Sequence, residues 1–472
     1  MDKDLADFSL MYLQQLGAHY AEARLDSTTG SGCLVKNGIP QISSFEHVRG
    51  LGIRFIVNHT LGFASTNKLD KPSIKRLLEK SFNVTKASAR IGEKTTLSEE
   101  HAHNHTYAVP QKIKFDSVDY SEKIQLLLDA DNNMRHKHIN IVGSFLSLSD
   151  NTVREYFVNT DGSAIDTTIP RANFYYFLTL QEGTKSAQRY WQYGGSGGYE
   201  LVNSWNIPDI LSNEITTTHA NLTKGAKPPI GKLDVVAAPQ VVAIMVHESV
   251  GHPYEADRIL GREAAQAGES FLTTDMHGHT IGSEHVTVID DPTIEGGLGF
   301  YLYDNEGVKA RKRILINKGN VDEFLHNRET AAELGTTSNA AARAMGYDRE
   351  PIIRMANTIL SPGDYTEEEL IEGVKHGVYM KNFMEWNIDD QRLNQKYVGA
   401  ESYLITNGKL DKPLAQPIIE INTPDLWKAV DGVAHNTEYH SGNCGKGEPM
   451  QGAPVWFGGP SMRIRNIILS GH

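Results

Sequence analysis

The sequence predicts an α+β fold with two domains, and three observations support this class. The chain has 472 residues, more than one compact core usually supports. Its first half mixes segments of helical spacing with segments that alternate like strands. Its second half is richer in short strands. We therefore expect an N-terminal α/β domain over residues 1–232, with a mixed or antiparallel sheet and flanking helices, and a strand-rich C-terminal domain over residues 233–472.

Three helices are expected in the first half, at Asp4–Gly17, Ser73–Phe82 and Tyr120–Met134, because apolar residues recur there at helical spacing. The glycine-containing segment Thr28–Cys33 is typical of a turn, and the glycine-rich segment Tyr193–Tyr199 of a flexible loop. The remaining alternating segments predict strands at Tyr20–Leu25, Cys33–Lys36, Arg49–Val57, Ile139–Ser147, Thr152–Val158 and Asn173–Leu180.

The second half is expected to open with a strand at Leu233–Ala237 and a buried helix that starts near Pro239, whose fixed φ suits a first helical turn. Residues 241–246 are apolar all round, which is typical of a helix inside a core. A further helix is predicted at Thr366–Lys375. Short strands are predicted at Val286–Asp290, Phe300–Tyr303, Lys312–Ile316, Val378–Phe383, Ala400–Thr406 and Ile418–Ile421.

The composition restricts the class of partner. The chain carries 46 basic and 58 acidic side chains, a net charge of −12, and no basic cluster, which argues against nucleic acid as a direct ligand. No signal peptide is apparent at the amino terminus. No apolar stretch approaches the ~18 residues that a membrane helix needs. We expect a cytoplasmic protein without a membrane span.

The most informative motif reads His-Glu-Ser-Val-Gly-His over residues 247–252. Two imidazoles offer neutral nitrogen ligands to a metal, and Glu248 between them can take a proton. In an ideal α-helix, however, a spacing of five residues turns His252 about 140° away from His247. Gly251 frees the backbone, and Pro253 disfavours α geometry in the residue before it. The motif therefore predicts a π-bulge or a broken last turn across Gly251 and His252.

The chain has two cysteines, Cys33 and Cys444, which a cytosolic protein would rarely join as a structural disulfide. Cys33 is interpreted as an ordinary thiol. Cys444 lies among small residues that allow close approach, and its thiolate could give a catalytic zinc its third protein ligand. Spacing alone leaves the role of Cys444 open.

Other polar residues near the motifs have two interpretations each. Glu255 and Asp257 follow the second histidine and are either partners for the imidazole N–H groups or solvated acids at a helix end. The tract His101–His105 is expected to be a solvated loop rather than a metal site. Arg354 and Asn357 are compatible with structural hydrogen bonding, and we leave them out of the catalytic set.

The chain resembles the TldD/PmbA family, named after modulation of DNA gyrase. The resemblance runs in order through nearly the whole chain, and it looks like the TldD branch because the PmbA (TldE) branch lacks the histidine–glutamate motif. The segments that carry it are Gly62–Thr66, His247–Asp257, Val286–Asp291, Asp304–Gly307, Arg354–Thr358, Cys444–Lys446 and Gly458–Pro460.

The resemblance implies a zinc-dependent peptidase that hydrolyses unfolded or short peptides. It implies His247, His252 and Cys444 as the zinc ligands and Glu248 as the acid that activates the zinc-bound water. It also implies a dimer, either of identical subunits or with a PmbA/TldE-like paralogue.

A second hypothesis is a non-catalytic, zinc-stabilised scaffold or binding subunit, in which the same ligands close a structural site. Glu248 favours the catalytic hypothesis, since a structural zinc site needs no acid between its ligands. Direct regulation of a DNA enzyme would rest on the family name alone, and the acidic composition argues against contact with DNA.

Overall fold

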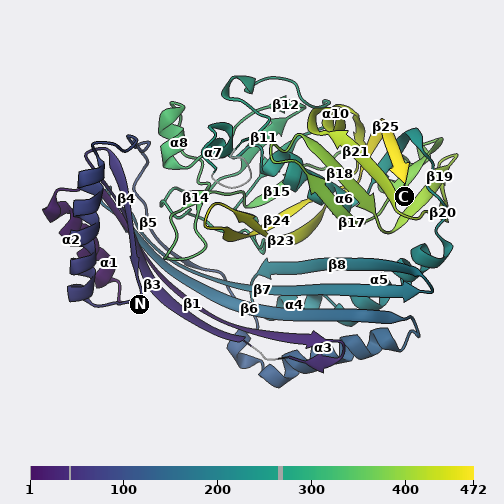
Figure 1. The fold of residues 1–472 in the computed structure, drawn as a ribbon, viewed down its shortest axis with the longest axis horizontal. Coiled ribbons are helices and arrows are strands. Elements are labelled where there is room, and N and C mark those ends of the chain that lie inside the picture. Colours follow the sequence, from purple (N-terminus) through teal and green to yellow (C-terminus); the bar gives the residue numbers. More distant parts are fainter. Residues whose placement is uncertain (1, 42–43, 264–268, 472) are drawn as a thin grey trace.

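The computed structural model describes residues 2–41, 44–263 and 269–471. One eight-stranded sheet contains strands from the first half of the chain, and three further sheets contain strands from the second half. The first sheet forms a long curved layer, and the C-terminal elements lie above one of its faces (Figure 1). Helices accompany both parts, which confirms the predicted α+β class.

The N-terminal sheet has the strand order β4-β3-β1-β6-β7-β5, with β2 paired to β1 and β8 paired to β7. Its pairs are antiparallel except for β5 with β7. The strands are β1 (Tyr20–Lys36), β2 (Ile39–Pro40), β3 (Ser44–Val57), β4 (Thr60–Thr66), β5 (Asn104–Ala108), β6 (Ile141–Asn159), β7 (Ala164–Glu182) and β8 (Lys185–Ser196).

These strands are longer than the sequence predicts. The expected turn at Thr28–Cys33 is wrong, because β1 continues through it and pairs with β3 and β6 on its two sides. A Cβ at Gly30 would overlap the Asp150 carbonyl oxygen, so this glycine permits close strand packing rather than a turn. Likewise, the expected flexible loop at Tyr193–Tyr199 is wrong over Tyr193–Ser196, which belong to β8.

Helices cover the lower face and one end of this sheet (Figure 1). The three helices predicted in this half are confirmed as α1 (Asp4–Leu16), α2 (Lys71–Ser88) and α3 (Tyr120–Arg135). Alternate apolar residues of β6 and β7 pack against α3 and α5 (Ile207–Lys224), and the short helix α4 (Glu200–Ser204) precedes α5. The residues between them on β6 and β7 face the C-terminal half.

The C-terminal half contains a nine-stranded, a six-stranded and a two-stranded sheet. The nine-stranded sheet comprises β9 (Gly231–Ala237), β16 (His376–Met380), β17 (Phe383–Ile388), β18 (Asn394–Gly399), β19 (Ser402–Thr406), β20 (Lys409–Pro413), β21 (Pro417–Asn422), β22 (Val430–Val433) and β25 (Met462–Gly471). The six-stranded sheet comprises β10 (Val288–Asp290), β11 (Arg313–Asn317), β12 (Asn320–Val321), β15 (Asn357–Leu360), β23 (Glu438–Lys446) and β24 (Gln451–Gly459). The two-stranded sheet pairs β13 (Ala342–Arg343) with β14 (Ile352–Ile353).

One predicted strand of this half is wrong. Phe300–Tyr303 forms no strand, and Tyr303 makes only an isolated bridge to Lys309. The chain turns back directly after Tyr303, where the Asp304 carboxylate accepts hydrogen bonds from the Glu306 and Val308 amides at 3.0 and 2.9 Å. The predicted helix after Thr366 is present as α9 (Glu367–Glu372) and begins with a capping box of Thr366 and Glu369.

The buried helix α6 (Pro239–Val246) follows β9 and packs against β24, β15 and β23 of the six-stranded sheet. Its predicted start at Pro239 is confirmed. The other short helices of this half are α7 (Ala256–Ile259), α8 (Arg328–Glu333) and α10 (Thr423–Lys428). The division into domains at residues 232 and 233 stays a proposal, supported by the separation of the strands into sheets. Within the described residues, no helix has both the length and the apolar character to cross a membrane.

Candidate metal centre

The helix that carries the histidine motif changes its geometry at the motif. After α6 the chain continues as one π-helical turn, η2 (His247–Gly251), and the His252 amide donates to the His247 carbonyl oxygen at 3.2 Å. This bond spans five residues, so residues five apart lie on nearly the same side of the helix. The predicted π-bulge is therefore confirmed, although it begins at His247, earlier than expected.

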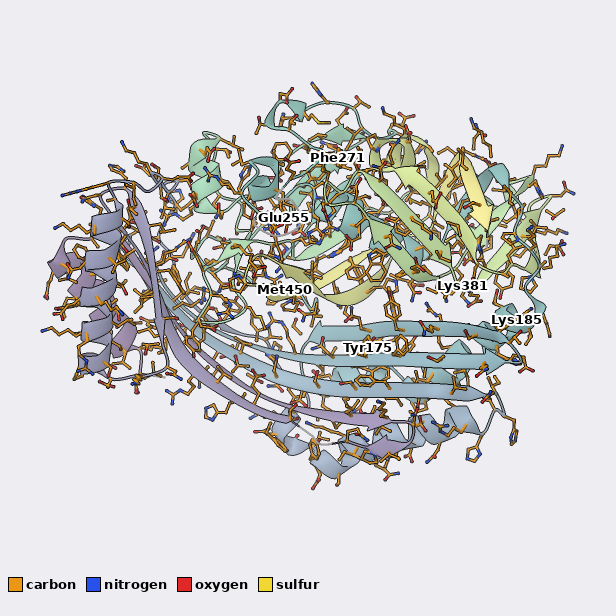
Figure 2. The ribbon with its side chains drawn as sticks, in the orientation of Figure 1. Tyr175, Lys185, Glu255, Phe271, Lys381 and Met450 are labelled. Carbon is orange, nitrogen blue, oxygen red and sulfur yellow. The ribbon has the colours of Figure 1, made fainter. Side chains whose placement is uncertain are left out.

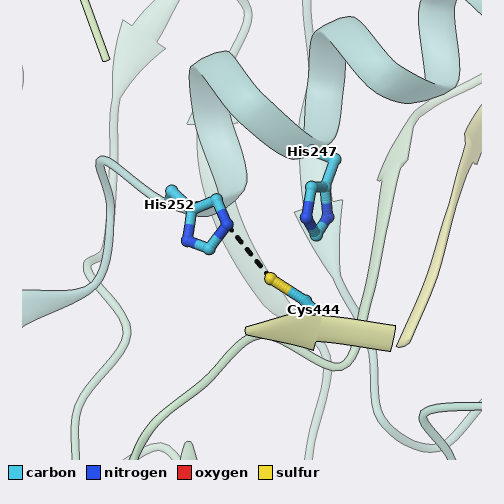
Figure 3. A group of neighbouring side chains, drawn as sticks. All are labelled: His247, His252 and Cys444. Atoms are coloured by element: carbon cyan, nitrogen blue, oxygen red, sulfur yellow. Dashed lines mark hydrogen bonds between the residues drawn. The ribbon is translucent and has the colours of Figure 1, made fainter. Parts of the chain in front are cut away.

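The π turn brings both imidazoles to the same side, where they meet a cysteine from a distant strand. The ring centroids of His247 and His252 are 5.0 Å apart. Cys444 lies on β23 and points toward them, as Figure 3 shows. One potential ligand atom from each of the three residues lies within 4.8 Å of the other two, and all three side chains are buried.

The hydrogen bonds of His252 fix which of its nitrogens faces the cysteine. Its Nδ1 lies 3.1 Å from Glu255 Oε2, and its Nε2 lies 3.1 Å from Cys444 Sγ. A carboxylate only accepts hydrogen bonds when ionised, so Nδ1–H donates to Glu255. When the ring is neutral, as a metal ligand must be, its Nε2 lone pair then faces the cysteine side. Such a carboxylate–histidine pair is the usual support of a metal-binding imidazole.

The donor set fits zinc. Two imidazoles and a thiolate suit Zn²⁺ and not a hard cation such as Mg²⁺, which prefers oxygen ligands. Among the described residues, His247 Nδ1 is buried and has no hydrogen-bond partner, which would cost free energy in a purely structural core. His247, His252 and Cys444 thus form a group that could hold a zinc ion through three protein ligands.

The electrostatics of the cluster favour the ligand form of the cysteine. Burial raises the pKa of the Cys444 thiol, but the neighbouring His252, His247 and Arg354 charges outweigh burial and hold this pKa well below its usual range. Burial in turn lowers the pKa of His247, yet the adjacent Cys444 sulfur and Glu248 raise it above its ordinary value. The thiolate, which is the form that binds metals, is therefore favoured.

Glu248 lies beside the cluster and is held by two side chains that the sequence motif did not indicate. Trp386 Nε1 donates to one carboxylate oxygen at 3.1 Å, and Arg392 Nη1 donates to the other at 2.8 Å. Burial raises the pKa of Glu248, but His247, His252 and Arg392 together lower it below its ordinary value. The carboxylate is thus ionised and fixed in orientation at neutral pH.

Glu255 and Asp257 differ in what they contact. Glu255 Oε2 lies 3.1 Å from His252 Nδ1, 3.1 Å from Lys446 Nζ and 3.2 Å from Arg258 Nε. Asp257 binds Lys446 Nζ through both oxygens, at 2.7 and 2.8 Å, rather than an imidazole. Burial raises the pKa of Asp257, whereas Lys446 and His252 overcome burial to hold the pKa of Glu255 well below its usual range. Figure 2 marks Glu255 inside the C-terminal half.

Arg354 holds the strand that carries the cysteine. Its guanidinium donates to the Cys444 carbonyl oxygen and, at 2.8 Å, to the Gln451 carbonyl oxygen across the β23–β24 hairpin. Asn357, by contrast, connects loops, since its amide group donates to the Asp291 carbonyl oxygen at 2.7 Å. Both observations agree with the structural interpretation of these residues.

A cavity of about 460 Å³ opens onto the metal site. His247, Glu248, His252 and Cys444 all line it, together with Arg392. Its remaining walls are largely aromatic and aliphatic, from Tyr190, Trp191, Ile244, Phe383, Val455 and Phe457. This size and this mixture of apolar walls with a few convergent polar groups are typical of a binding site for a small molecule or a peptide segment.

The other candidates from the sequence lie elsewhere. Cys33 is buried in the N-terminal half, and burial raises the pKa of its thiol to about 11. Within the described part of the chain, the group with metal-ligand geometry contains no member of the tract His101–His105. His101 and His105 are exposed, and His105 belongs to β5 rather than to a loop.

Known proteins resemble this chain over its whole length. Three family descriptions match it in order: PmbA/TldA metallopeptidase domain 1 at residues 21–84, the central domain at 113–221 and the C-terminal domain at 230–471. A protein named metalloprotease from Methanocaldococcus jannaschii is 32% identical and aligns with 94% of this chain and 95% of its own length. A zinc metalloprotease TldD homolog from Saccharolobus solfataricus is 24% identical, over 97% of this chain and 98% of its own.

Solved structures show the same fold. TldE from Thermococcus kodakarensis superposes with a TM-score of 0.75 at 16% identity, over 99% of each chain. A candidate modulator of DNA gyrase from Bacteroides thetaiotaomicron superposes with a TM-score of 0.77 at 20% identity, over 100% of this chain and 99% of its own. The family descriptions along the sequence and the relative of 32% identity show that the chain belongs to the PmbA/TldD family of metallopeptidases.

Proposed function

We propose that the protein is a zinc-dependent peptidase that hydrolyses peptide bonds of unfolded or short peptides. The observation that carries the proposal is the position of Glu248, whose carboxylate lines the same cavity as His247, His252 and Cys444. The names of the relatives, which include metalloprotease and zinc metalloprotease, support the same reaction class.

His247, His252 and Cys444 would hold the zinc ion, and Glu255 would keep the His252 ring in the orientation that the ion needs. When bound, zinc supplies a Lewis acid that polarises a carbonyl and makes water more acidic. The low-pKa thiolate of Cys444 adds a negative charge that balances part of the charge of the cation.

Glu248 would move the proton. Its carboxylate accepts a proton from the water that attacks the peptide carbonyl and then passes this proton to the departing amine. Arg392 and Trp386 each donate to one Glu248 oxygen, so the carboxylate is aimed into the cavity before substrate arrives. His247, His252 and then Arg392 lower the pKa of Glu248, so the carboxylate is ionised, which is the state a proton acceptor needs.

The buried position of the site favours substrates without stable tertiary structure. A folded protein could not bring a peptide bond to side chains that are as deeply buried as His252, which is 3% exposed. We further propose a dimer with a second copy or with a PmbA/TldE-like paralogue, supported by the structural likeness to TldE. Light scattering of the purified protein, alone and mixed with such a paralogue, distinguishes the two assemblies.

The test is the Glu248→Gln variant, which keeps the shape of the side chain and removes its ability to accept the proton. We expect zinc to remain bound and cleavage of a mixture of unfolded peptides, followed by mass spectrometry, to fall by about 10²–10⁴-fold. The exposed Glu368→Gln variant on α9 is the matched control and should cleave like the natural protein. Undiminished cleavage by zinc-loaded Glu248→Gln would instead favour the non-catalytic scaffold.

A further inference from the structure

A second cavity, of about 470 Å³, lies between the N-terminal sheet and the C-terminal half. Its floor consists of alternate residues of β6 and β7, on the sheet face opposite α3 and α5, and its lining is mostly polar. Gln192, Gly442 and Asn443 line both this cavity and the cavity at the metal site. Asn443 directly precedes Cys444 on β23, so the two cavities adjoin on this strand.

Two buried arginines line the second cavity. Arg171 on β7 is 9% exposed and donates to the Leu298 and Phe300 carbonyl oxygens at 3.0 and 3.4 Å. Arg343 on β13 is 7% exposed, donates to the Met355 carbonyl oxygen at 2.8 Å and lies over the Tyr301 ring at 5.4 Å. In the described part of the chain, neither guanidinium forms an ion pair with a carboxylate, although other buried arginines such as Arg313 do.

The carboxylates that line this cavity are bound to other groups. Glu155 accepts from Asn305 Nδ2 at 2.9 and 2.7 Å and lies 3.5 Å from Arg24 Nε. Asp304 accepts from three backbone amides, those of Glu306, Val308 and Ala342. Burial raises the pKa of both carboxyl groups to about 8. The remaining acid of the lining, Glu46, is exposed. Among the residues that the structure describes, no carboxylate therefore forms an ion pair with either guanidinium, although the Glu155 and Asp290 charges act on Arg171 and Arg343 from a greater distance.

Two such cations would be costly unless an anion joins them. Burial, and for Arg171 the nearby Arg343 charge, lowers the pKa of each guanidinium to about 10, so both remain protonated at neutral pH. A buried charge without a partner is destabilising, whereas a guanidinium binds a carboxylate strongly through paired N–H donors. Each arginine uses only part of its five donors on backbone oxygens, which leaves donors for a ligand.

We propose that Arg171 and Arg343 bind a carboxylate of the peptide substrate, either its C-terminal carboxylate or an acidic side chain. The inference rests on the proposed peptidase function, because the adjoining metal site is where the same peptide would be cut. A peptide anchored at the arginines would extend past Asn443, along β23, toward Cys444. The arginine pair would then select where along the peptide cleavage occurs.

Binding is tested in the cleavage-deficient Glu248→Gln background with fluorescent peptides, measured by anisotropy. One pair of peptides differs only in a C-terminal carboxylate against an amide, and a second pair differs only in internal Asp and Glu against Asn and Gln. We expect the carboxylate form of one pair to bind about 10- to 100-fold more tightly than its neutral form. The pair that shows the preference identifies the source of the carboxylate. Equal affinities within both pairs would overturn the proposal.

The arginines are tested by adding Arg343→Gln or Arg171→Gln to the same background. The ratio of the affinities for the carboxylate and the neutral peptide should fall toward one, while the affinity for the neutral peptide stays unchanged. General damage to the fold would not produce this result. Arg343→Lys, which keeps the charge, should retain part of the preference. Arg465→Gln is the control, since Arg465 pairs with Asp431 and Asp234 and lines neither cavity. A preference that survives both glutamine variants would refute the role of the arginines.

A failure of the carboxylate site can be distinguished from a failure of the proposed peptidase function. If carboxylate peptides bind in an arginine-dependent way but the zinc-loaded natural protein cleaves none of them, the peptidase proposal fails and the carboxylate site stands. If cleavage occurs with equal rates and affinities for carboxylate and neutral peptides, the peptidase proposal stands and the carboxylate site fails.

Discussion

Glu255 contacts both segments that carry the candidate metal ligands. Its carboxylate contacts His252 at the end of the π turn and Lys446 on β23, the strand that carries Cys444. Replacement by glutamine should therefore loosen the imidazole and lower zinc affinity by about 10–100-fold. Competition with a chromogenic chelator measures this change, with the exposed Glu368→Gln as control. A Glu255→Gln protein that holds zinc as tightly as the natural protein would show that Glu255 does not support the site.

His326 predicts a pH dependence of stability that does not involve the metal site. Burial lowers its pKa to about 4, while the unfolded chain has the ordinary value of about 6.5. Between these values the unfolded state binds a proton that the folded state excludes, so stability is full above pH 6.5 and falls as the pH drops toward 4. The contribution reaches about 1.4 kcal/mol per pH unit. Urea unfolding of His326→Gln between pH 7 and 5 should show a shallower pH dependence, whereas exposed His105→Gln should not differ from the natural protein.

At the residue scale, the sequence indicated the candidate metal-site residues that lie close together in a motif. His247, Glu248 and His252 lie together in one motif. The small residues around Cys444 made it a possible ligand, but only the family resemblance connected it to the histidines. Arg392 and Trp386 were missed, since their contacts with Glu248 arise only when β17 and the loop after it fold over the motif. Their sequence surroundings contain no signal that could have identified them.

The π turn is the element on which the metal site depends. A Cβ at Gly251 would overlap the Met355 sulfur, so Gly251→Ala should force η2 or Met355 to move. We expect zinc affinity to fall by about 10-fold or more and unfolding free energy to fall by about 1–3 kcal/mol. Zinc titration and urea unfolding measure the two effects.

The double variant Gly251→Ala/Met355→Ala provides the control for this explanation. Removal of the Met355 side chain creates the space that the alanine methyl group needs, so zinc affinity should recover relative to Gly251→Ala alone. If Gly251→Ala binds zinc normally, or if the double variant recovers nothing, crowding against Met355 is not the reason for the glycine.

Element geometry could be predicted where one local constraint dominates. Five-residue spacing in an apolar helix required a π turn, and Pro239 marked the helix start. Strand lengths could not be predicted in the same way. Thr28 to Gly32 has turn-like composition, yet strand pairing on both sides keeps the segment extended. Conversely, Phe300–Tyr303 has strand-like composition but lies in a loop that Asp304 fixes through backbone amides.

At the scale of the whole molecule, zinc should stabilise the fold because its ligands come from segments 192 residues apart in sequence. Free zinc at about 100 times its Kd should raise the free energy of unfolding by about 2.7 kcal/mol over the metal-free protein. Urea unfolding with and without a chelator measures this increment. Cys33→Ser should keep the increment and Cys444→Ser should lose most of it. An increment that is equal in both variants would contradict the assignment of Cys444.

The overall class and the abundance of C-terminal strands could be predicted, but the relation between the two halves could not. In the sequence, the alternating polar residues of β6 and β7 indicate an ordinary solvent-exposed sheet face. In the structure it is the floor of a cavity, because the C-terminal half lies over it (Figure 2, where Met450 near the β23–β24 turn and Tyr175 on the sheet are marked). Arg171 and Arg343 become neighbours only through this arrangement.

The central claim is that one zinc ion is bound by two imidazoles and the Cys444 thiolate. X-ray absorption spectroscopy of the zinc-loaded protein at the zinc K-edge tests it most directly. We predict one sulfur ligand at about 2.3 Å and two imidazole nitrogens at about 2.0–2.1 Å, with the sulfur signal absent in Cys444→Ser. A spectrum of the natural protein without a sulfur ligand, or a sulfur signal that persists in Cys444→Ser, would contradict the claim.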